Sequence, residues 1–188
     1  LRGRRRRRRR GRRVKRRMTL YPPLAPAAAL RWGGIAAAAV AILDQVTKAL
    51  AHAALFSNPR IIEVTSFFNL VPVWNRGVSF GIFADGPEIT RWLLTVFALV
   101  VSVILGLWMA RGGRRLLVFG LALIIGGAIG NVIDRVRFGA VIDFVDLHAG
   151  GYHWPAFNIA DAAIFCGVVM LIVENLWPSR HDDQEHRA

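Results

Sequence analysis

Internal disulfide bonds are excluded in this chain, because Cys166 is its only cysteine. Cys166 lies in the apolar stretch AIFCGVVML, so we expect a small buried side chain there and not a nucleophile. The five histidines are scattered along the chain, and none of them has the H-E-x-x-H spacing of a zinc peptidase. We therefore expect chemistry that needs neither a metal nor another cofactor.

Charged residues are also scarce over four long apolar segments. A membrane core of about 30 Å is crossed by a helix of roughly 20 apolar residues. The segments that reach this length are residues 30–55, 90–110, 116–133 and 160–177. The second and third have almost no polar face, which argues against a soluble helical bundle. The first is too long for a cleaved signal peptide and contains Asp44 and Lys48, so we predict four transmembrane helices.

The positive charge of the chain is concentrated at its N-terminus. Residues 1–17 contain 13 of the 25 Lys and Arg residues and no acid, so the rest of the chain is neutral. We interpret this arm as a disordered, solvated charge run, with attraction to anionic lipid headgroups as the alternative. No nucleic-acid binding is expected, because no aromatic residues are interleaved with the arginines. Met18 follows the run directly, and we hypothesise that the native chain starts there.

The basic segments also predict the orientation of the helices. The arm and the RGGRR loop at residues 111–115 should both face the cytoplasm. The predicted orientation divides the chain into three parts: a cytoplasmic arm at 1–29, a transmembrane domain at 30–178 and a cytoplasmic polar tail at 179–188. Two segments, 56–89 and 134–159, then face outward. The first is rich in Val, Ile and Phe, so we predict short antiparallel strands there, whereas HAGGYHWP in the second is typical of a loop.

Ionisable residues on three of these segments fall at one depth. With a rise of about 1.5 Å per residue, Asp44 lies about 20 Å from the cytoplasmic end of its helix, Asp134 about 28 Å and Asp161 about 24 Å. Ionisable groups are costly to bury in a membrane, so they face a bundle interior and are either paired or functional. We therefore predict a polar site near the outer face.

Two pairs of charged residues that lie close together in the sequence have a structural interpretation. Asp44 and Lys48 are four residues apart, in the order that favours an ion pair on one helix face. We expect this pair to brace the first helix, with a direct catalytic role as the alternative. Asp134 and Arg135 should end the third helix and, as neighbours, point in different directions.

The remaining outer aspartates differ in their surroundings. Asp161 follows Asn158 at the start of the fourth segment, where either residue suits a helix cap. Asp143 is flanked by Val, Ile and Phe in GAVIDFVDL, on a short strand or a turn, and such an apolar setting raises the pKa of a carboxyl group. Asp146 is nearer the glycine-rich loop, so we expect it to be solvated.

Two aspartates that share one site cannot easily ionise together, so they hold one proton between them. Such a pair can activate water with one carboxylate and protonate a carbonyl oxygen with the other, as in aspartic proteases. From the residues alone, an ion or proton carrier with aspartates inside the membrane explains the pattern equally well.

Five motifs, taken together, resemble one known family. They are LDQVTK at 43–48, NRGVSFG at 75–81, GGAIGNVIDR at 126–135, GAVIDF at 139–144 and PAFNIADAAI at 155–164. In this order, with four apolar segments around them, they resemble lipoprotein signal peptidase, also called signal peptidase II. The resemblance covers residues 30–177. Val78 and Ser79 depart from it, because small alanines are common at these positions in the family.

The resemblance implies a fold, an activity and a set of site residues. The fold would be an all-α membrane protein of four transmembrane helices with a small extracytoplasmic β-sheet cradle and a lid, supplied by residues 56–89 and 136–157. The activity would be that of an aspartic endopeptidase, which cuts diacylglyceryl-modified prolipoproteins on the amino side of the lipidated cysteine. By motif position, Asp143 and Asp161 would be catalytic. The supporting residues would be Asn131, Arg135, Asn158, Asn75, Asp44, Lys48 and Asp134.

The resemblance also implies partners and a location. Lipid-modified prolipoproteins and membrane lipids would be partners, and the cyclic peptide globomycin would inhibit. The protein would act as a monomer in the bacterial cytoplasmic membrane, with both termini in the cytoplasm and the active site near the outer face.

Overall fold

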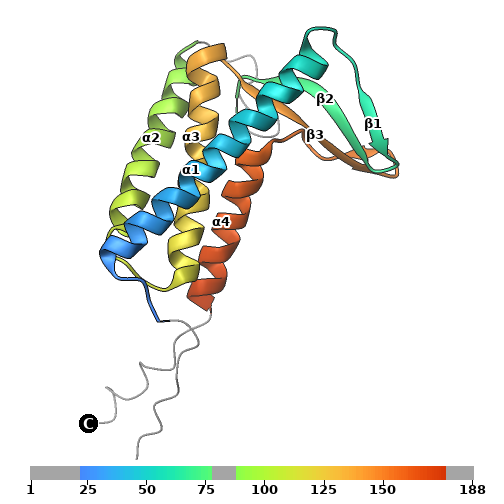
Figure 1. Ribbon diagram of the computed structural model, residues 1–188. Helices are drawn as coiled ribbons and strands as arrows, with labels where there is room; N and C mark the ends of the chain where they lie inside the picture. The colour runs from blue at the N-terminus through green and yellow to red at the C-terminus, as the bar shows by residue number, and fades with distance from the viewer. Residues whose placement is uncertain (1–21, 78–87, 177–188) are drawn as a thin grey trace, which may run out of the picture.

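Long helices and one small antiparallel sheet make up the part of the chain that this computed structural model describes, residues 22–77 and 88–176 (Figure 1). The helices are α1 Pro26–Ala51, α2 Glu88–Met109, α3 Arg115–Phe138 and α4 Ile159–Leu176. A short π-helix, η1 His52–Phe56, continues α1. Within the described ranges, 4 helices are long and apolar enough to cross a membrane, which confirms the predicted fold class.

The third helix is longer than its sequence predicts. We expected it to end near residue 133, but α3 continues to Phe138, so Asp134 and Arg135 lie inside the helix. Two arginines occupy its last turn, where positive side chains interact favourably with the helix dipole. Gly139 follows with a φ of 76°, in the left-handed conformation that commonly ends a helix.

Helix α3 is the centre of the bundle and packs against α1, α2 and α4. Of its most apolar stretch 56% is buried, against 11% to 17% in the other three helices, which therefore present most of their apolar side chains to lipid. Glycines let the neighbours of α3 approach closely. A Cβ atom on Gly127 would overlap the Ala160 carbonyl oxygen of α4, and one on Gly130 would overlap the Asp44 carboxylate of α1.

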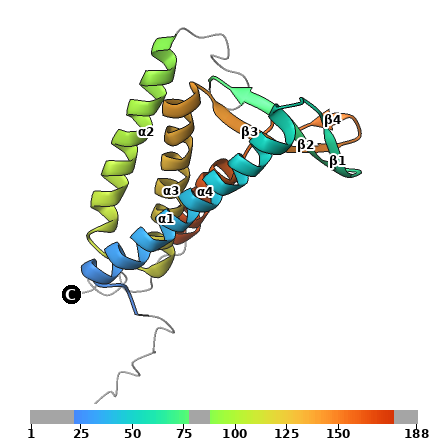
Figure 2. The ribbon, with the colours of Figure 1, turned by 45° about the horizontal axis from the view of Figure 1, so that its top comes forward.

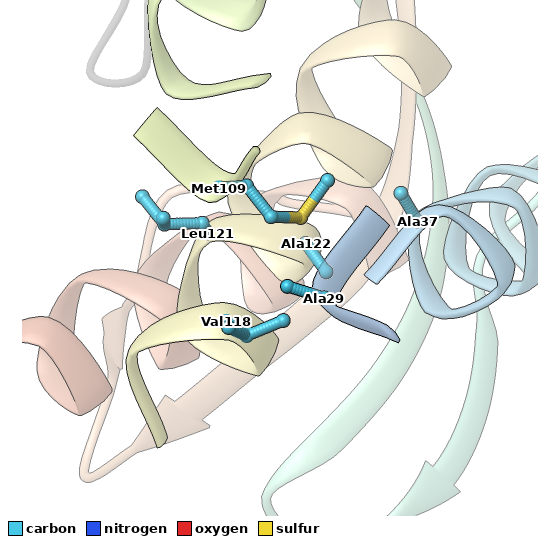
Figure 3. Packing of buried hydrophobic residues seen from close by; sticks show 6 residues of the cluster. All are labelled: Ala29, Ala37, Met109, Val118, Leu121 and Ala122. Carbon is cyan, nitrogen blue, oxygen red and sulfur yellow. The ribbon is translucent and has the colours of Figure 1, made fainter. Parts of the chain in front are cut away.

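The apolar core of the bundle lies at the end where α1 and α3 begin. Its buried members are Ala29 and Ala37 of α1, Met109 of α2, and Val118, Leu121 and Ala122 of α3 (Figure 3). At the same end, the Arg114 guanidinium before α3 forms an ion pair of 2.9 Å with Glu174 of α4. The sheet joins the helices away from this core, where α3 ends and α4 begins (Figure 1).

The sheet has the strand order β1–β2–β3–β4, and all neighbouring strands are antiparallel. The strands are Ile62–Thr65, Phe68–Asn75, Val141–Ala149 and Tyr152–His153. Figure 2 shows that the sheet extends sideways from the bundle, away from α2. The strands predicted in the first outer segment are confirmed. The loop predicted for HAGGYHWP is confirmed only in part. Gly150 and Gly151, with φ of 57° and 84°, form a tight turn, but the residues on either side of them belong to β3 and β4 and make a hairpin.

Apolar and aromatic contacts hold the sheet against the helices. Leu55 of η1 packs with Ile142 and Phe144 of β3 in a second buried cluster. Beside it, rings from η1, β2 and α3 stack, meet edge to face or meet at a tilt, and these are His52, Phe56, Trp74 and Phe138. Strand β3 is therefore fixed relative to η1 and α3, and with it the two aspartates that the strand carries, Asp143 and Asp146.

Candidate active site

Two aspartates meet where β3 approaches the start of α4. Asp143 lies in β3, and Asp161 lies in the first turn of α4. Asn158 contacts both of them: its Nδ2 donates to Asp143 Oδ1 over 2.7 Å, and its backbone N–H donates to Asp161 Oδ2 over 3.2 Å. Asp143 is only 1% exposed, whereas Asp161 is half-buried and lines a cavity. The structure thus brings together the two aspartates that the sequence singles out.

The start of α4 holds Asp161 in place. Asn158 Oδ1 accepts a hydrogen bond from the Asp161 N–H over 3.0 Å, and the Asp161 carboxylate accepts one from the Asn158 N–H in return. This reciprocal arrangement is a capping box, which satisfies two N–H groups that a helix start leaves without partners. The predicted cap is confirmed, and both residues contribute to it. The cap and the candidate site are therefore built from the same side chains.

Amide N–H groups donate hydrogen bonds to both carboxylates. Asn75 Nδ2 donates to Asp143 Oδ2 over 2.9 Å, and Asn131 Nδ2 donates to Asp161 Oδ1 over 2.9 Å. With the two contacts from Asn158, each oxygen of both carboxylates accepts one hydrogen bond from an amide N–H. The orientation of both carboxylates is therefore fixed before any ligand enters.

The amides that donate to the aspartates are themselves oriented. Asn75 Oδ1 accepts a hydrogen bond from the Gly77 N–H over 3.0 Å, and Asn131 Oδ1 accepts one from Lys48 Nζ over 2.9 Å. Because these amide oxygens are engaged by donors, the NH₂ groups of Asn75 and Asn131 must face the carboxylates.

Lys48 is the centre of a buried ionic network behind the aspartates. It is 2% exposed, and its Nζ lies 2.9 Å from carboxylate oxygens of both Asp44 and Asp134. Asp44 accepts a hydrogen bond from the Ala160 N–H of α4 over 2.9 Å, and Asp134 accepts one from the Ile142 N–H of β3 over 3.1 Å. The predicted Asp44–Lys48 ion pair is confirmed. The two acids also tie α1 and α3 to the elements that carry Asp161 and Asp143.

Arg135 points away from Asp134, as their adjacency predicts. Its Nη2 lies 3.4 Å from the Gly77 carbonyl oxygen, and its side chain lines the same cavity as Asp161. Its positive charge interacts with Asp161, Asp143 and Asp134. Arg135 is thus a second cation of the site, on the cavity side of the aspartates, whereas Lys48 is buried behind them.

The pKa of the Asp143 carboxyl is raised to about 7. Burial is the largest cause and repulsion from Asp161 the second, while the hydrogen bonds from Asn75 and Asn158 lower the pKa. The pair can therefore hold one proton near neutral pH, as the acid–base chemistry of an aspartic protease requires.

Asp146 does not have the solvated environment that its position near the glycines predicts. It is 6% exposed, Asn69 Nδ2 donates to its Oδ2 over 3.0 Å, and His153 Nδ1 lies 2.9 Å from its Oδ1. Burial raises the pKa of this carboxyl, but the hydrogen bonds from His153 and Asn69 outweigh burial and lower it. The prediction is wrong because β2 and β4 flank β3 here and supply partners that are distant in sequence.

Sequence reasoning also missed contacts of two uncharged residues. Gln45 Nε2 donates to Asp134 Oδ1 over 2.9 Å and so belongs to the Lys48 network, and Asn69 holds Asp146. Gln45 was visible as a polar residue beside Asp44 in an apolar helix, whereas no local pattern marks Asn69. Val78 and Ser79, like the rest of 78–87, lie outside the described residues.

Two apolar cavities adjoin the site. The larger, of about 540 Å³, lies between α2, α3 and α4 and is polar only where Asn75, Asn131, Arg135 and Asp161 line it. The smaller, of about 390 Å³, lies between residues 154–157 and the first turns of α4, and Cys166 lines it. Cys166 is exposed, so the prediction of a buried thiol is wrong: the side chain faces away from the bundle.

Comparison with known proteins identifies the family. Residues 36–177 match the model of the family described as Signal peptidase (SPase) II. The lipoprotein signal peptidase of Methylobacterium sp. (strain 4-46) is 50% identical over 152 residues, which are 80% of this chain and 92% of that protein. The lipoprotein signal peptidase of Janthinobacterium sp. (strain Marseille) is 49% identical over 148 residues, 78% of this chain and 88% of that one.

Solved structures agree with this assignment. A bacterial membrane enzyme determined by the in meso method at 2.3 Å resolution superimposes with a TM-score of 0.67 at 27% identity, covering 84% of this chain and 92% of that one. A second such structure, at 1.9 Å resolution, has a TM-score of 0.69 at 28% identity and covers 79% and 95%. The chain belongs to the signal peptidase II family, the membrane aspartic endopeptidases that remove signal peptides from prolipoproteins.

Proposed function

We propose that Asp143 and Asp161 are the catalytic pair of this peptidase, and that it cuts diacylglyceryl-modified prolipoproteins on the amino side of the lipidated cysteine. The main support is that Asn158 contacts both carboxylates at the polar end of an apolar cavity between helices. This arrangement presents acid–base groups to a peptide bond and an apolar space to the lipid that is attached next to it.

In the proposed mechanism, Asp143 holds the proton of the resting pair and Asp161 is the base. Asp161 faces the cavity, whereas Asp143 is buried and has a pKa raised to about 7. Asp161 takes a proton from a water molecule as that water attacks the scissile carbonyl carbon, and Asp143 gives its proton to the carbonyl oxygen. As the carbon–nitrogen bond breaks, the proton on Asp161 passes to the leaving nitrogen. One hydroxyl of the tetrahedral intermediate returns its proton to Asp143 as the new carbonyl forms, so the pair ends with the single proton with which it began.

The surrounding residues have positioning and electrostatic roles in this proposal. The amide groups of Asn75, Asn131 and Asn158 fix the orientation of the two carboxylates through the hydrogen bonds described above. Arg135, at the cavity edge, stabilises the developing oxyanion. The network of Lys48, Asp44 and Asp134 acts through Asn131, because Lys48 Nζ fixes the direction of that amide.

The charge distribution supports the proposed membrane setting. Basic residues in the loop between α2 and α3 favour the cytoplasmic side, so the aspartates lie near the outer face of the bacterial cytoplasmic membrane and both termini are cytoplasmic. Residues 1–29 and 179–188 then form a cytoplasmic arm and tail. Membrane lipids surround the exposed apolar helix faces, and a monomer contains the whole site.

The test is cleavage of a purified diacylglyceryl-modified prolipoprotein by reconstituted enzyme. Asp143→Asn and Asp161→Asn should each leave no detectable product while thermal unfolding stays cooperative. Asp146→Asn is the matched control, since it removes a buried acid from the same strand, three residues along, and should retain cleavage. A near wild-type rate in either of the first two variants would reject the assignment of the pair.

Globomycin provides a second test. It should block cleavage by the wild-type enzyme and should compete with the prolipoprotein for binding. The carrier hypothesis predicts proton or ion flux in liposomes and no peptide product, so flux without cleavage would support it and count against the peptidase mechanism.

A further inference from the structure

Asp161 stands between the two apolar cavities. Asp161 and Phe165 line both of them, so the cavities occupy neighbouring faces of α4 and adjoin at the candidate base. The larger cavity continues along α4 from Asp161 to Val168, about 10 Å by the helix rise. The smaller one follows α4 from Asp161 to Cys166, about 8 Å by the helix rise, and its other wall is Leu147 with residues 154–157.

The substrate has two apolar parts, one on each side of the bond that is cut. This step rests on the proposed function. The acyl chains are attached to the cysteine directly after the bond, whereas the signal peptide before the bond contains an apolar region of about 7–15 residues. These two parts diverge from the same peptide bond, so an enzyme that binds both needs two apolar spaces that meet at its catalytic pair.

We propose that the smaller cavity binds the last residues of the signal peptide, those directly before the cut, while the acyl chains enter the larger cavity. The larger cavity lies between three membrane helices and reaches Val101 of α2 and Ile124 of α3, so it follows the helices as acyl chains do. The smaller one has only α4 on its helical side and is closed by segment 154–157, which joins β4 to α4 and offers an extended peptide a parallel wall. Its wall combines the small side chains of Ala156 and Ala162 with the aromatic rings of Trp154, Phe157 and Phe165.

The surface of α4 extends this path. Below the smaller cavity, Val169, Val173 and Leu176 continue from Cys166 at helical spacing, and all are exposed. An apolar signal-peptide helix that leaves the cavity toward the cytoplasm can pack along this stripe within the lipid. The smaller cavity is therefore the outer end of a continuous apolar surface along α4, and it connects that surface to Asp161.

Cys166 makes the proposal testable, because it is the only cysteine of the chain and lines the smaller cavity. The full chain carrying Asp143→Asn is reconstituted with lipid-modified prolipoproteins that each have one free cysteine, placed at successive positions before the cut or after the lipidated cysteine. The lipidated cysteine is itself blocked by its thioether. Oxidation should yield at least about tenfold more adduct from positions before the cut, because a disulfide requires Cα atoms within about 7 Å.

The matched control moves the thiol to the other cavity. Cys166→Ser combined with Val168→Cys places it two residues along the same helix, where it lines the larger cavity. This variant should lose the preference for positions before the cut. Two results would overturn the proposal. One is that Cys166 forms adducts only with substrate cysteines placed after the lipidated cysteine. The other is that Cys166 forms no adduct although the substrate still co-purifies with the enzyme.

Cleavage separates this proposal from the function on which it rests. Wild-type enzyme is first assayed with the same cysteine-bearing substrates. If none is cut, the proposed function fails, whereas cleavage without the expected adducts contradicts only the assignment of the smaller cavity.

Side-chain size gives an independent readout. Ala162→Leu narrows the smaller cavity, so it should raise KM more for prolipoproteins with bulky residues before the cut than for those with small ones. Ala98→Leu makes the same change in the larger cavity and should affect both substrates equally. Equal effects of Ala162→Leu on both substrates would also overturn the proposal.

Discussion

Removing the amide of Asn75 should change the pH dependence of cleavage. Asn75 Nδ2 donates to Asp143 Oδ2 over 2.9 Å, and this hydrogen bond lowers the pKa of the Asp143 carboxyl, which burial and Asp161 raise to about 7. A donor stabilises the ionised carboxylate, so its loss in Asn75→Ala must raise that pKa further.

The size of the effect follows from the energy of the bond. A hydrogen bond to a charged group contributes about 1.5–3 kcal/mol, and one pKa unit corresponds to about 1.4 kcal/mol. Water that enters the space left by the amide replaces part of the hydrogen-bond energy. We therefore expect the lower end of the energy range, which corresponds to a rise of about one unit in the pKa of Asp143. The active pair holds one proton, which is lost on the alkaline side as Asp143 ionises. The alkaline limb of the profile should therefore move up by about one pH unit.

The assay is kcat/KM for a lipid-modified prolipoprotein across the pH range, since this quantity reports the ionisation of the free enzyme. Asn69→Ala is the matched control. Asn69 lies on the same strand and its amide also donates to an aspartate of β3, but that aspartate is Asp146. The control should leave the alkaline limb in place. An unchanged or lowered limb in folded Asn75→Ala, or an equal shift in the control, would refute the reasoning.

Three further predictions concern stability and positioning. Lys48→Met leaves two buried carboxylates without their cation, so thermal unfolding in detergent should show a loss of about 3–5 kcal/mol, and an unchanged Tm would contradict the network. Gly130→Ala should lower the free energy of unfolding by about 1–3 kcal/mol in the same measurement, because the added Cβ overlaps the Asp44 carboxylate. Gly106→Ala is the control: the added Cβ meets no atom within 4 Å, so the stability should be unchanged or slightly higher. Asn158→Ser keeps a helix-cap acceptor but loses the amide that donates to Asp143, so kcat/KM should fall about tenfold or more with little change in stability. A parallel loss of stability would assign Asn158 a purely structural role.

Features that depend on neighbouring residues of the chain were predictable. The four helices follow from segment length, since a segment inside a membrane must satisfy its own backbone hydrogen bonds. The Asp44–Lys48 pair and the cap formed by Asn158 and Asp161 are likewise relations between residues three or four apart, which helix geometry alone brings together.

Features that depend on which elements pack together were not predictable. Asp146 is buried because β2 and β4 flank it, and Cys166 is exposed because α4 turns that face away from α3. The same holds for the site. No local spacing joins Asp143 to Asp161, and the family resemblance alone suggested that they act together. Their contact through Asn158 exists because the Lys48 network and close glycine packing on α3 set the positions of α1, α4 and β3. The sequence by itself determined the membrane helices and the types of polar groups, because these depend on local composition. Only the tertiary structure decided which carboxylates face one another, because that depends on packing between distant segments.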